Sequence, residues 1–302
     1  MKTILVTGSN GLLGQKLTER IITFKQFNLI ATSKGANRFP GQQGYKYVSM
    51  DILDPLNIQI VMESYRPDAV IHTAAMTNVD TCEAQQDLAY ALNVTAVKTL
   101  IENCEIYNSQ FIHLSTDFIF DGAAGPYDEL ASPNPLSYYG HTKAIAEELV
   151  KKADCPWVII RTILVYGIVG DLSRSNIVLW AKAALEKGEP LNVVNDQWRM
   201  PTLAEDLADA CLLAVEKDAR GIYHVSGKDM MNIAGLVRRV AAYWNLDSSL
   251  INEISSASLN QSAHRPAKTG FILDKAIADL GYQPHGFEEG LAILDEQVKA
   301  LI

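Results

Sequence analysis

"TGSNGLLG", residues 7–14, is the stretch that decides the expected fold. It follows the apolar run "ILV" and carries glycines at positions 8, 11 and 14, a G-x-x-G-x-x-G spacing. A strand before such a turn and a helix after it let backbone N–H groups approach a pyrophosphate at the helix N-terminus. The same spacing also fits a tight strand-to-helix turn that binds nothing. The remainder of the chain has to distinguish the two interpretations.

Strand-like and helix-like segments alternate along the first half of the chain. Short strands are predicted at residues 2–7, 28–33, 45–54, 68–75, 110–120 and 157–167. Helices are predicted at 11–24 and 55–65, over roughly twenty residues between the fourth and fifth strands, and around Lys143. This alternation predicts an α/β fold of Rossmann type, with a doubly wound parallel sheet covered on both faces. The ligand crevice of such a sheet lies beyond the carboxyl ends of its strands.

The order of the elements loosens after residue 167. We therefore expect a dinucleotide-binding domain over residues 1–167 and a smaller, mainly substrate-binding lobe over residues 168–302. A helix at 202–217 is expected to pack back on the first domain, and a short strand is predicted at 221–227. The remainder reads as helical between loops. We expect this lobe to close over the crevice.

Composition and charge exclude several classes of protein. The 302 residues are 48% hydrophobic and 20% charged, which is ordinary for a globular protein, and the net charge of -9 argues against nucleic-acid binding. Four scattered cysteines without a C-x-x-C pair indicate neither a disulfide framework nor a zinc site. The apolar run after Lys2 is shorter than the roughly 7 to 15 residues of a signal peptide, and nothing approaches the ~18 apolar residues of a membrane helix. We expect a soluble, cytoplasmic protein without membrane partners.

The segment after the second strand, "IATSKGANR", contains no Asp or Glu. A carboxylate there would accept a hydrogen bond from the ribose 2′-hydroxyl of NAD. Ser33, Lys34 and Arg38 could instead receive the 2′-phosphate of NADP, and a solvated basic loop is the alternative. The segment therefore favours NADP over NAD.

Two aspartates end the third predicted strand, in "DILD". Asp51 is placed where it could meet an adenine amino group, although an Asp at a helix entry is more often a cap. For Asp54, which precedes Pro55, we predict helix capping.

The sharpest chemical signal is "YYGHTK", which contains Tyr139 and Lys143. Four residues apart on a helix, the two side chains share a face, and an ammonium beside a phenol is expected to lower its pKa from about 10. Such a phenol could protonate a carbonyl oxygen while hydride reaches the carbon. Ser115, Thr116 and Asp117 follow the fifth strand and face the same crevice, where a hydroxyl could hold the substrate oxygen. The alternatives are an exposed surface pair and local turn bonding.

With these residues assembled, the chain resembles an extended short-chain dehydrogenase/reductase, and within that superfamily the dTDP-4-dehydrorhamnose reductase family. The resemblance covers essentially the whole chain. Its motifs are "TGSNGLLG", "HTAAMTNVDTCE" (72–83), "LNVTAV" (92–97), "STDFIFDG" (115–122), "YYGHTK" (138–143), "RTILVYG" (161–167), "NDQWRMPTLAEDLA" (195–208) and "RPAKTGFILD" (265–274). Members reduce the 4-keto group of a nucleotide-linked deoxysugar, which completes dTDP-L-rhamnose synthesis.

The resemblance implies roles for individual residues. Thr116, Tyr139 and Lys143 match the catalytic hydroxyl, acid and lysine, and Lys143 would also hold the nicotinamide ribose hydroxyls. The residues matched to the cofactor are Gly8, Asn10, Gly11, Leu12 and Leu13 at the pyrophosphate, with Gly14 completing the turn; Asp51 and Ile52 at the adenine; Ala74, Ala75 and Thr77 beneath the cofactor; and Asn93 near it.

The chain departs from the family where the substrate would lie. Leu164 stands where the sugar reductases usually carry Trp, whose indole would give a sugar ring stacking area. After Gly167 the text "GDLSRSNIVLW" replaces a pair of asparagines followed by Phe. Arg199 replaces a small residue, and Arg199 and Arg265 could contact a substrate phosphate or pair with surface carboxylates. Asp117 and Phe118 are further candidates for the substrate side.

Three functions are compatible with these features. The first is an NAD(P)H-dependent reductase of a keto group on a nucleotide-linked sugar or a related small carbonyl compound. The second is a nucleotide-sugar epimerase or dehydratase with bound NAD, although Phe118 after Asp117, in place of a glutamate, disfavours dehydration. The third is a non-catalytic NADP-binding subunit similar to the regulatory subunit of methionine adenosyltransferase. Some family members use Mg²⁺ between subunits, but no acidic cluster indicates a site here; a homodimer stays open.

Overall fold

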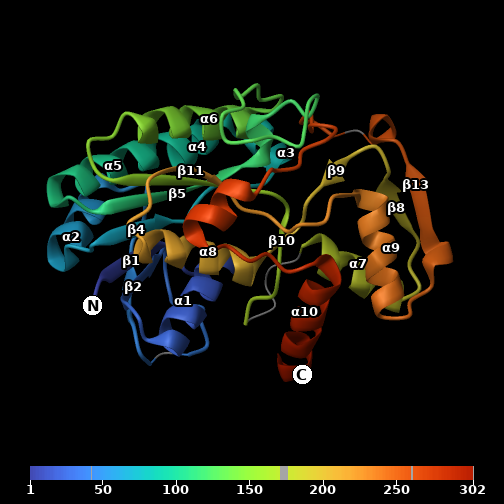
Figure 1. Ribbon diagram of the computed structural model, residues 1–302, viewed down its shortest axis with the longest axis horizontal. Helices are drawn as coiled ribbons and strands as arrows, with labels where there is room; N and C mark the ends of the chain where they lie inside the picture. The colour runs from blue at the N-terminus through green and yellow to red at the C-terminus, as the bar shows by residue number, and fades with distance from the viewer. Residues whose placement is uncertain (42, 171–175, 260, 302) are drawn as a thin grey trace.

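The computed structural model describes residues 1–301 except 42, 171–175 and 260. The segment "DLSRS" that departs from the family after Gly170 therefore lies outside the described residues. A seven-stranded sheet with the order β11-β6-β5-β4-β1-β2-β3 forms the centre of the molecule, and every pairing within it is parallel (Figure 1). Its strands are β1 (Thr3–Thr7), β2 (Asn28–Ser33), β3 (Lys46–Ser49), β4 (Ala69–His72), β5 (Gln110–Thr116), β6 (Trp157–Thr162) and β11 (Gly221–His224). The predicted Rossmann-type α/β fold is confirmed.

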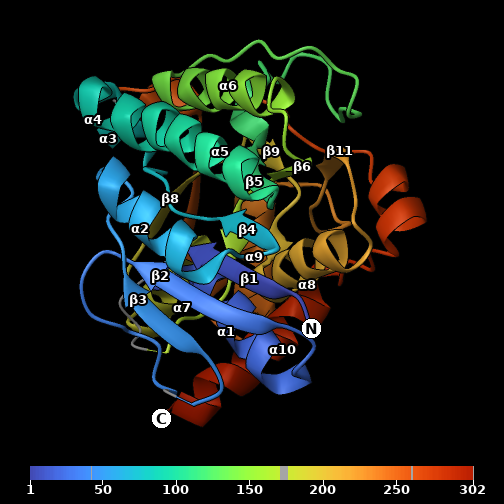
Figure 2. The ribbon, with the colours of Figure 1, turned by 90° about the vertical axis from the view of Figure 1, so that its left-hand side faces the viewer.

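Helices cover both faces of this sheet (Figure 2). One face packs on α1 (Leu12–Phe24) and α8 (Ala204–Glu216), the other on α2 (Pro55–Tyr65), α5 (Ala96–Tyr107) and α6 (Tyr138–Lys151). Successive strand residues point to opposite faces, so Ile4 and Val6 join the core with α1 and α8, whereas Leu5 joins the core with α2 and α5. A strand buried on both sides is continuously apolar, which is why "ILV" carries no alternation.

The second half of the chain contributes to this sheet as well as to the lobe. Strand β11 pairs with β6, and α8 packs against α1, so both elements lie with the dinucleotide-binding fold. The lobe itself lies at the other end of the molecule (Figure 1). Its helices are α7 (Ile177–Glu186), α9 (Ile233–Tyr243) and α10 (Phe287–Leu301).

The lobe also contains short strands, so the prediction that its remainder is helical is wrong. They pair as β8 (Leu191–Val194) with β13 (Ile251–Ile254), β9 (Trp198–Arg199) with β12 (Met231–Asn232), and β7 (Val165–Tyr166) with β10 (Thr202–Leu203). The β8–β13 pairing joins residues about sixty positions apart in register, which no local pattern reveals. An apolar core of its own, including Val178, Leu191 and Val237, holds the lobe together.

Several predicted strands are too long at their carboxyl ends, where turns begin. Strand β5 stops at Thr116, whose hydroxyl accepts from Phe118 N at 3.2 Å, and a 3₁₀ turn (Asp117–Ile119) follows. Strand β3 stops at Ser49, and Asp51 accepts from Leu53 N at 3.0 Å. Strand β6 ends at Thr162, before Leu164 adopts a left-handed φ of 41°.

The single helix predicted between the fourth and fifth strands is divided into four segments. They are α3 (Val79–Ala84), α4 (Gln86–Tyr90), a π-helical turn (Ala91–Thr95) and α5. Asn78 caps α3 by accepting from Thr81 N at 2.8 Å, and Gln85 leaves helical geometry between α3 and α4. Such π turns often accompany functional sites.

None of the helices among the described residues is both long and apolar enough to cross a membrane. All four cysteines are buried and unpaired.

Candidate active site

The glycine turn connects β1 to α1 with close backbone contacts. Gly8 has a left-handed φ of 69°, and a Cβ on it would lie 2.8 Å from Ala74 N. A Cβ on Gly14 would lie 2.4 Å from Gly8 O, so only glycine lets the helix approach the turn this closely. No side chain caps the start of α1, its first turn has no acidic residue, and the buried Ser9 hydroxyl has no hydrogen-bond partner among the described residues. This uncapped, positively polarised helix end fits the phosphates of a dinucleotide.

The side chain of Asn10 fixes the loop that follows β2. Its amide nitrogen donates to Ala36 O at 2.9 Å, and its amide oxygen accepts from Arg38 N at 2.8 Å. Tyr47 on β3 adds a second brace, since its hydroxyl donates to Gly35 O at 2.7 Å. The loop with the predicted 2′-phosphate residues is thus tied to the glycine turn and to β3.

The basic residues of this loop have different surroundings. Lys34 Nζ pairs with Asp51 Oδ2 at 2.8 Å, and this contact lowers the pKa of Asp51. Ser33 is half-buried, while Arg38 is exposed and has no ion-pair partner among the described residues. Arg38 is thus the cation of the loop that a 2′-phosphate could recruit without breaking an ion pair.

The neighbouring residues at the end of β3 are placed as follows. Ile52 is buried, and Asp54 caps α2 by accepting from Leu56 N and Asn57 N at 3.0 and 3.2 Å. The predicted capping role of Asp54 is confirmed.

Asn93 joins the segment after β4 to the helix that carries Tyr139. Its amide oxygen accepts from Met76 N at 2.9 Å, and its nitrogen donates to Met76 O at 3.0 Å and to Thr142 Oγ1 at 3.1 Å. Both Asn93 and Thr142 are buried. Ala74 and Ala75 are half-buried just before Met76, and Thr77 just after it is exposed. Asn93 therefore holds the segment after β4 in place at Met76 and ties it to α6.

Thr116, Tyr139 and Lys143 lie together at the carboxyl end of β5. Tyr139 and Lys143 are buried on the first two turns of α6, and Ser137 caps that helix by accepting from Gly140 N at 3.2 Å. The Tyr139 ring packs edge-on against Phe118, with ring centroids 5.9 Å apart. The Thr116 hydroxyl donates to Asp117 Oδ1 at 3.2 Å and also lies within hydrogen-bonding reach of the Tyr139 phenol. This arrangement can hold a carbonyl oxygen and supply it with a proton.

The expected lowering of the Tyr139 pKa is wrong for this structure. Burial raises the pKa of Tyr139, a hydrogen bond with Thr116 opposes the rise, and the Asp117 carboxylate adds to it. The Lys143 ammonium contacts His113 Nε2 at 3.1 Å. Burial lowers the pKa of Lys143 to about 8, against the opposing effect of Glu147. Desolvation is therefore the largest influence on the phenol, and Lys143 is not among the groups that shift its pKa.

Asp117 and Arg199 connect the sheet to the lobe inside the protein. Arg199 Nε lies 3.6 Å from Asp117 Oδ2, and both side chains are almost fully buried. Thr269 also donates to Asp117 Oδ2, while Arg199 donates to Pro266 O and Trp198 O at 2.8 and 2.7 Å. Burial raises the pKa of Asp117, and Arg199 opposes this. Both predicted alternatives for Arg199 are therefore wrong: its carboxylate partner is buried and not on the surface, and its guanidinium is not open to a substrate phosphate.

Arg265 and Leu164 complete the substrate-side candidates. Arg265 pairs with Asp80 on α3, with contacts of 2.5 and 3.3 Å, and the half-exposed Asp80 also accepts from Ser262 Oγ at 3.0 Å. Arg265 thus has the carboxylate partner that was one of its two predicted alternatives. Leu164 packs against both the sheet core and the lobe core.

Four residues around the site went unrecognised in the sequence. Besides His113, these are Glu147, Arg161 and Thr269. Glu147 on α6 and Arg161 on β6 form a buried two-bonded ion pair at 2.9 and 2.7 Å that anchors α6 to the sheet. A charged residue inside an otherwise apolar strand, as in "VIIRT", was the available signal.

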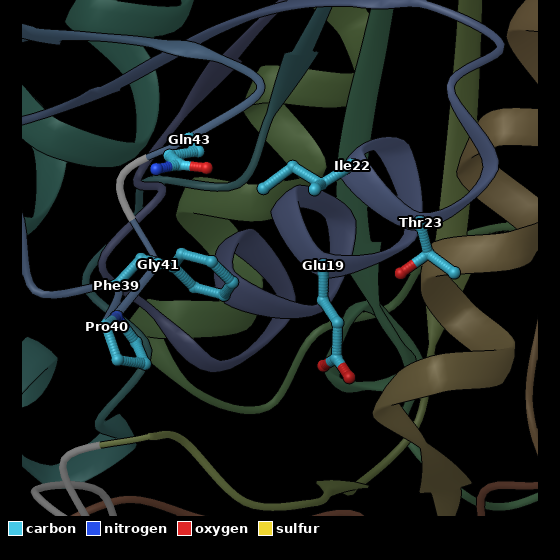
Figure 3. A pocket seen from close by; sticks show the side chains of 7 residues that line it. All are labelled: Glu19, Ile22, Thr23, Phe39, Pro40, Gly41 and Gln43. Carbon is cyan, nitrogen blue, oxygen red and sulfur yellow. The ribbon is translucent and has the colours of Figure 1, made fainter.

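A pocket of about 500 Å³ lies elsewhere, between the second half of α1 and residues 39–41 and 43 (Figure 3). Glu19, Ile22 and Phe39 are among its lining residues, and none of the predicted site residues is. We assign this hollow no role. Across the described residues, His, Cys, Asp and Glu side chains form no group that could hold a metal ion.

Comparison with known proteins gives the chain its relatives. The RmlD substrate binding domain family matches residues 1–299. Spore coat polysaccharide biosynthesis protein SpsK of Bacillus subtilis is 31% identical over 295 residues, 96% of each chain. Methionine adenosyltransferase 2 subunit beta of Xenopus tropicalis is 30% identical over 256 residues, 83% of this chain and 75% of that one. The solved structure of dTDP-4-dehydrorhamnose reductase from Bacillus anthracis in complex with NADP has a TM-score of 0.83 at 25% identity, covering 98% of this chain and 99% of that one.

Proposed function

The chain belongs to the RmlD family of extended short-chain dehydrogenases/reductases, a class of nicotinamide-dependent oxidoreductases, and from this we propose that it is an NADPH-dependent reductase of a nucleotide-linked keto sugar. The observation that carries the proposal is the gathering of Thr116, Tyr139 and Lys143 at the carboxyl end of β5. The glycine turn follows β1 at the same edge of the sheet. A hydroxyl, a phenol and an ammonium beside a phosphate-binding turn suit carbonyl reduction.

The residues present fit the cofactor that this chemistry needs. The uncapped start of α1 and the glycine turn would hold the pyrophosphate, and Arg38 with Ser33 would hold the 2′-phosphate. Asp51 and Ile52 would face the adenine, and Lys143 would hold the nicotinamide ribose. When bound, the reduced nicotinamide supplies the hydride. The absence of a carboxylate between residues 30 and 38 and the NADP complex of the Bacillus anthracis relative support NADP over NAD.

The chain's own part in the reaction is to hold the carbonyl oxygen and to protonate it. Thr116 has one hydroxyl proton, directed to Asp117 in the structure. To bind a carbonyl oxygen, the hydroxyl rotates from Asp117 Oδ1 to the substrate, while Thr269 and Arg199 keep their contacts with Asp117 Oδ2. Tyr139 then gives its phenolic proton to the oxygen, and the Lys143 ammonium stabilises the phenolate that forms.

On the substrate side, the sugar would lie against Phe118 and Leu164. The guanidinium of Arg199 is already occupied by buried contacts, so Arg265 is the better candidate for a substrate phosphate. The phosphate would have to displace Asp80 from Arg265. We propose 4-keto nucleotide sugars as the substrate class. We name no individual sugar, because Leu164 offers less stacking area for a sugar ring than the Trp of the sugar reductases.

A 340-nm assay against a panel of 4-keto nucleotide sugars, with NADPH and the purified chain, tests the proposal. Oxidation of one NADPH per molecule of reduced sugar is the expected result. Product formed without net NADPH change would indicate an epimerase. NADPH binding without turnover of any panel member would contradict the proposal and favour a non-catalytic role like that of the adenosyltransferase subunit.

A further inference from the structure

We propose that His113 is a positioning residue for Lys143: a neutral imidazole whose Nε2 accepts the lysine ammonium, fixes its place and favours its charged form. The inference rests on the proposed function only in the catalytic role that it gives Lys143. His113 itself contacts neither the phenol nor the glycine turn through any hydrogen bond among the described residues.

The contact joins two buried side chains from different elements. His113 lies on β5, three residues before Thr116, and Lys143 lies on α6, which packs against that strand. Nζ and Nε2 are 3.1 Å apart, and the exposed fractions are 3% for Lys143 and 0% for His113. A buried ammonium without a partner is costly, so this bond matters more than a surface contact would.

The ammonium determines the tautomer of the histidine. An ammonium has only donors, so Nε2 must be the unprotonated nitrogen and Nδ1 must carry the proton. Nδ1 is buried and has no hydrogen-bond partner among the described residues. No hydrogen bond at Nδ1 therefore favours either tautomer, and the contact with Lys143 decides between them.

The ring is held in place by its neighbours on the sheet. His113 stacks on His72 of β4 and on Phe111, with centroids 5.9 and 6.1 Å apart and interplanar angles of 23° and 24°. His72 is in turn bonded through Nδ1 to Thr7 Oγ1 at 2.8 Å. A ring clamped in this way offers its acceptor at one position, which is what a positioning residue requires.

The charges around the pair keep His113 neutral. Burial lowers the pKa of His113, and the nearby Lys143 and then His72 lower it further. The other charged group that faces Lys143 is Glu147, one turn along α6, and Glu147 already forms a two-bonded ion pair with Arg161 of β6. His113 is thus the direct partner of the ammonium, while the carboxylate acts at longer range.

The test uses nuclear magnetic resonance of the whole protein and needs no turnover. ¹⁵N spectra of the histidine side chains, assigned with His113→Phe, should show His113 neutral and in the Nδ1–H tautomer near pH 7. ¹³Cε titration of Lys143, assigned with Lys143→Met, should give a pKa near 8 in the unmodified protein. In His113→Phe, loss of the acceptor should lower that pKa by about one unit. In His113→Gln, whose amide oxygen can accept, it should move by less than about 0.3 unit.

His72→Phe is the matched control, because Phe keeps a ring against His113 but removes the imidazole of the next strand, whose hydrogen bond is to Thr7 and not to Lys143. It should leave the Lys143 titration unchanged. An Nε2–H tautomer for His113, or equal Lys143 pKa values in the unmodified protein and His113→Phe, would overturn the proposal. If His113→Phe does not fold, His113→Gln assigns the His113 signals in its place, and the tautomer spectrum decides the question. Because both readouts are spectroscopic, failure of the proposed reductase activity would leave them unaffected and would be recognised separately in the 340-nm assay.

Discussion

The pKa of Tyr139 is raised and that of Lys143 is lowered, so both shifts favour the uncharged side chain. The two residues therefore respond differently to pH. Burial raises the pKa of Tyr139, so the phenol keeps its proton throughout the working range. Burial lowers the pKa of Lys143 from 10.5 to about 8, so the ammonium is the group that titrates first as the pH rises. Tyr139 therefore stays protonated as the pH rises, whereas Lys143 loses its positive charge.

The pH dependence of the reaction should therefore follow Lys143. The ammonium is present below its pKa and lost above it, so kcat/KM should be level below about pH 8 and fall roughly tenfold per pH unit above it. A pH–rate profile with a saturating cofactor concentration checks this. A profile that stays level to pH 9.5 would contradict the assignment of the ammonium.

Unfolding of the protein is not expected to cause the fall in kcat/KM above about pH 8. Because the folded pKa of Lys143 lies below its ordinary value of 10.5, the unfolded chain binds more protons between about pH 8 and 10.5. The contribution of this group to the free energy of unfolding therefore rises with pH in that window. Thermal melts over the same range separate a change in stability from a change in chemistry.

At the scale of the element, the loop between β2 and β3 is the part that we propose selects the cofactor. Asn10 and Tyr47 fix its backbone, Lys34 is paired with Asp51, and Arg38 is exposed. A loop held at both ends can present one side chain reproducibly. We infer that cofactor preference depends on Arg38 more than on the other basic residue.

Arg38→Ala should consequently weaken NADPH binding by roughly ten- to a hundredfold, the value of a charge-assisted phosphate contact, and leave NADH binding nearly unchanged. Lys34→Ala is the matched control and should cost less than about threefold, since its ammonium is already paired with Asp51. Calorimetric titration of each variant with both cofactors measures the effect. Equal losses of NADPH affinity in the two variants, or equal losses for NADH, would show that the loop does not read the 2′-phosphate through Arg38.

Elements were predictable where local chemistry determines them. The glycine turn, the flanking β1 and α1, and the cap at Asp54 follow from short-range geometry, and each is present. Strand ends were missed at Ser49 and Thr116, because side-chain hydrogen bonds to the backbone end those strands within residues that still look apolar. The direction of the Tyr139 pKa was missed because it depends on burial by Phe118 and its neighbours, which the spacing of Tyr and Lys does not contain.

At the scale of the whole molecule, two ion pairs join the sheet to the lobe, and they differ in burial. Arg199–Asp117 is almost fully buried, whereas Arg265–Asp80 has one half-exposed partner. A buried charge left without its partner is far more costly than an exposed one. The inner pair should thus dominate the coupling between the two parts.

Arg199→Ala should lower the free energy of unfolding by about 3–5 kcal/mol, because it leaves the Asp117 carboxylate buried and uncompensated. Arg265→Ala, as the control at the outer pair, should cost about 1 kcal/mol or less. Urea denaturation of both variants measures these values. An equal or smaller loss in the free energy of unfolding for Arg199→Ala than for Arg265→Ala would contradict the greater importance of the inner pair.

These long-range partnerships were beyond reach from the sequence. Arg199 and Asp117 are 82 positions apart in the chain, and His113 and Lys143 are joined only because α6 packs on β5. Periodicity reports which face of an element is apolar, but it does not report which charged residue of one element meets which residue of another. The proximity of Tyr139 and Lys143 could be predicted, since they share one helix, and Thr116 was singled out by the family resemblance.

The central claim is that Tyr139 supplies the proton in a nicotinamide-dependent reduction, and Tyr139→Phe tests it most directly. NADPH affinity and the rate of NADPH oxidation with a turned-over keto sugar should be measured on the same preparation. We predict a loss in kcat of at least about a hundredfold, with NADPH affinity unchanged to within about twofold. A variant that oxidises NADPH at the original rate, or that loses cofactor binding and turnover together, would contradict the account.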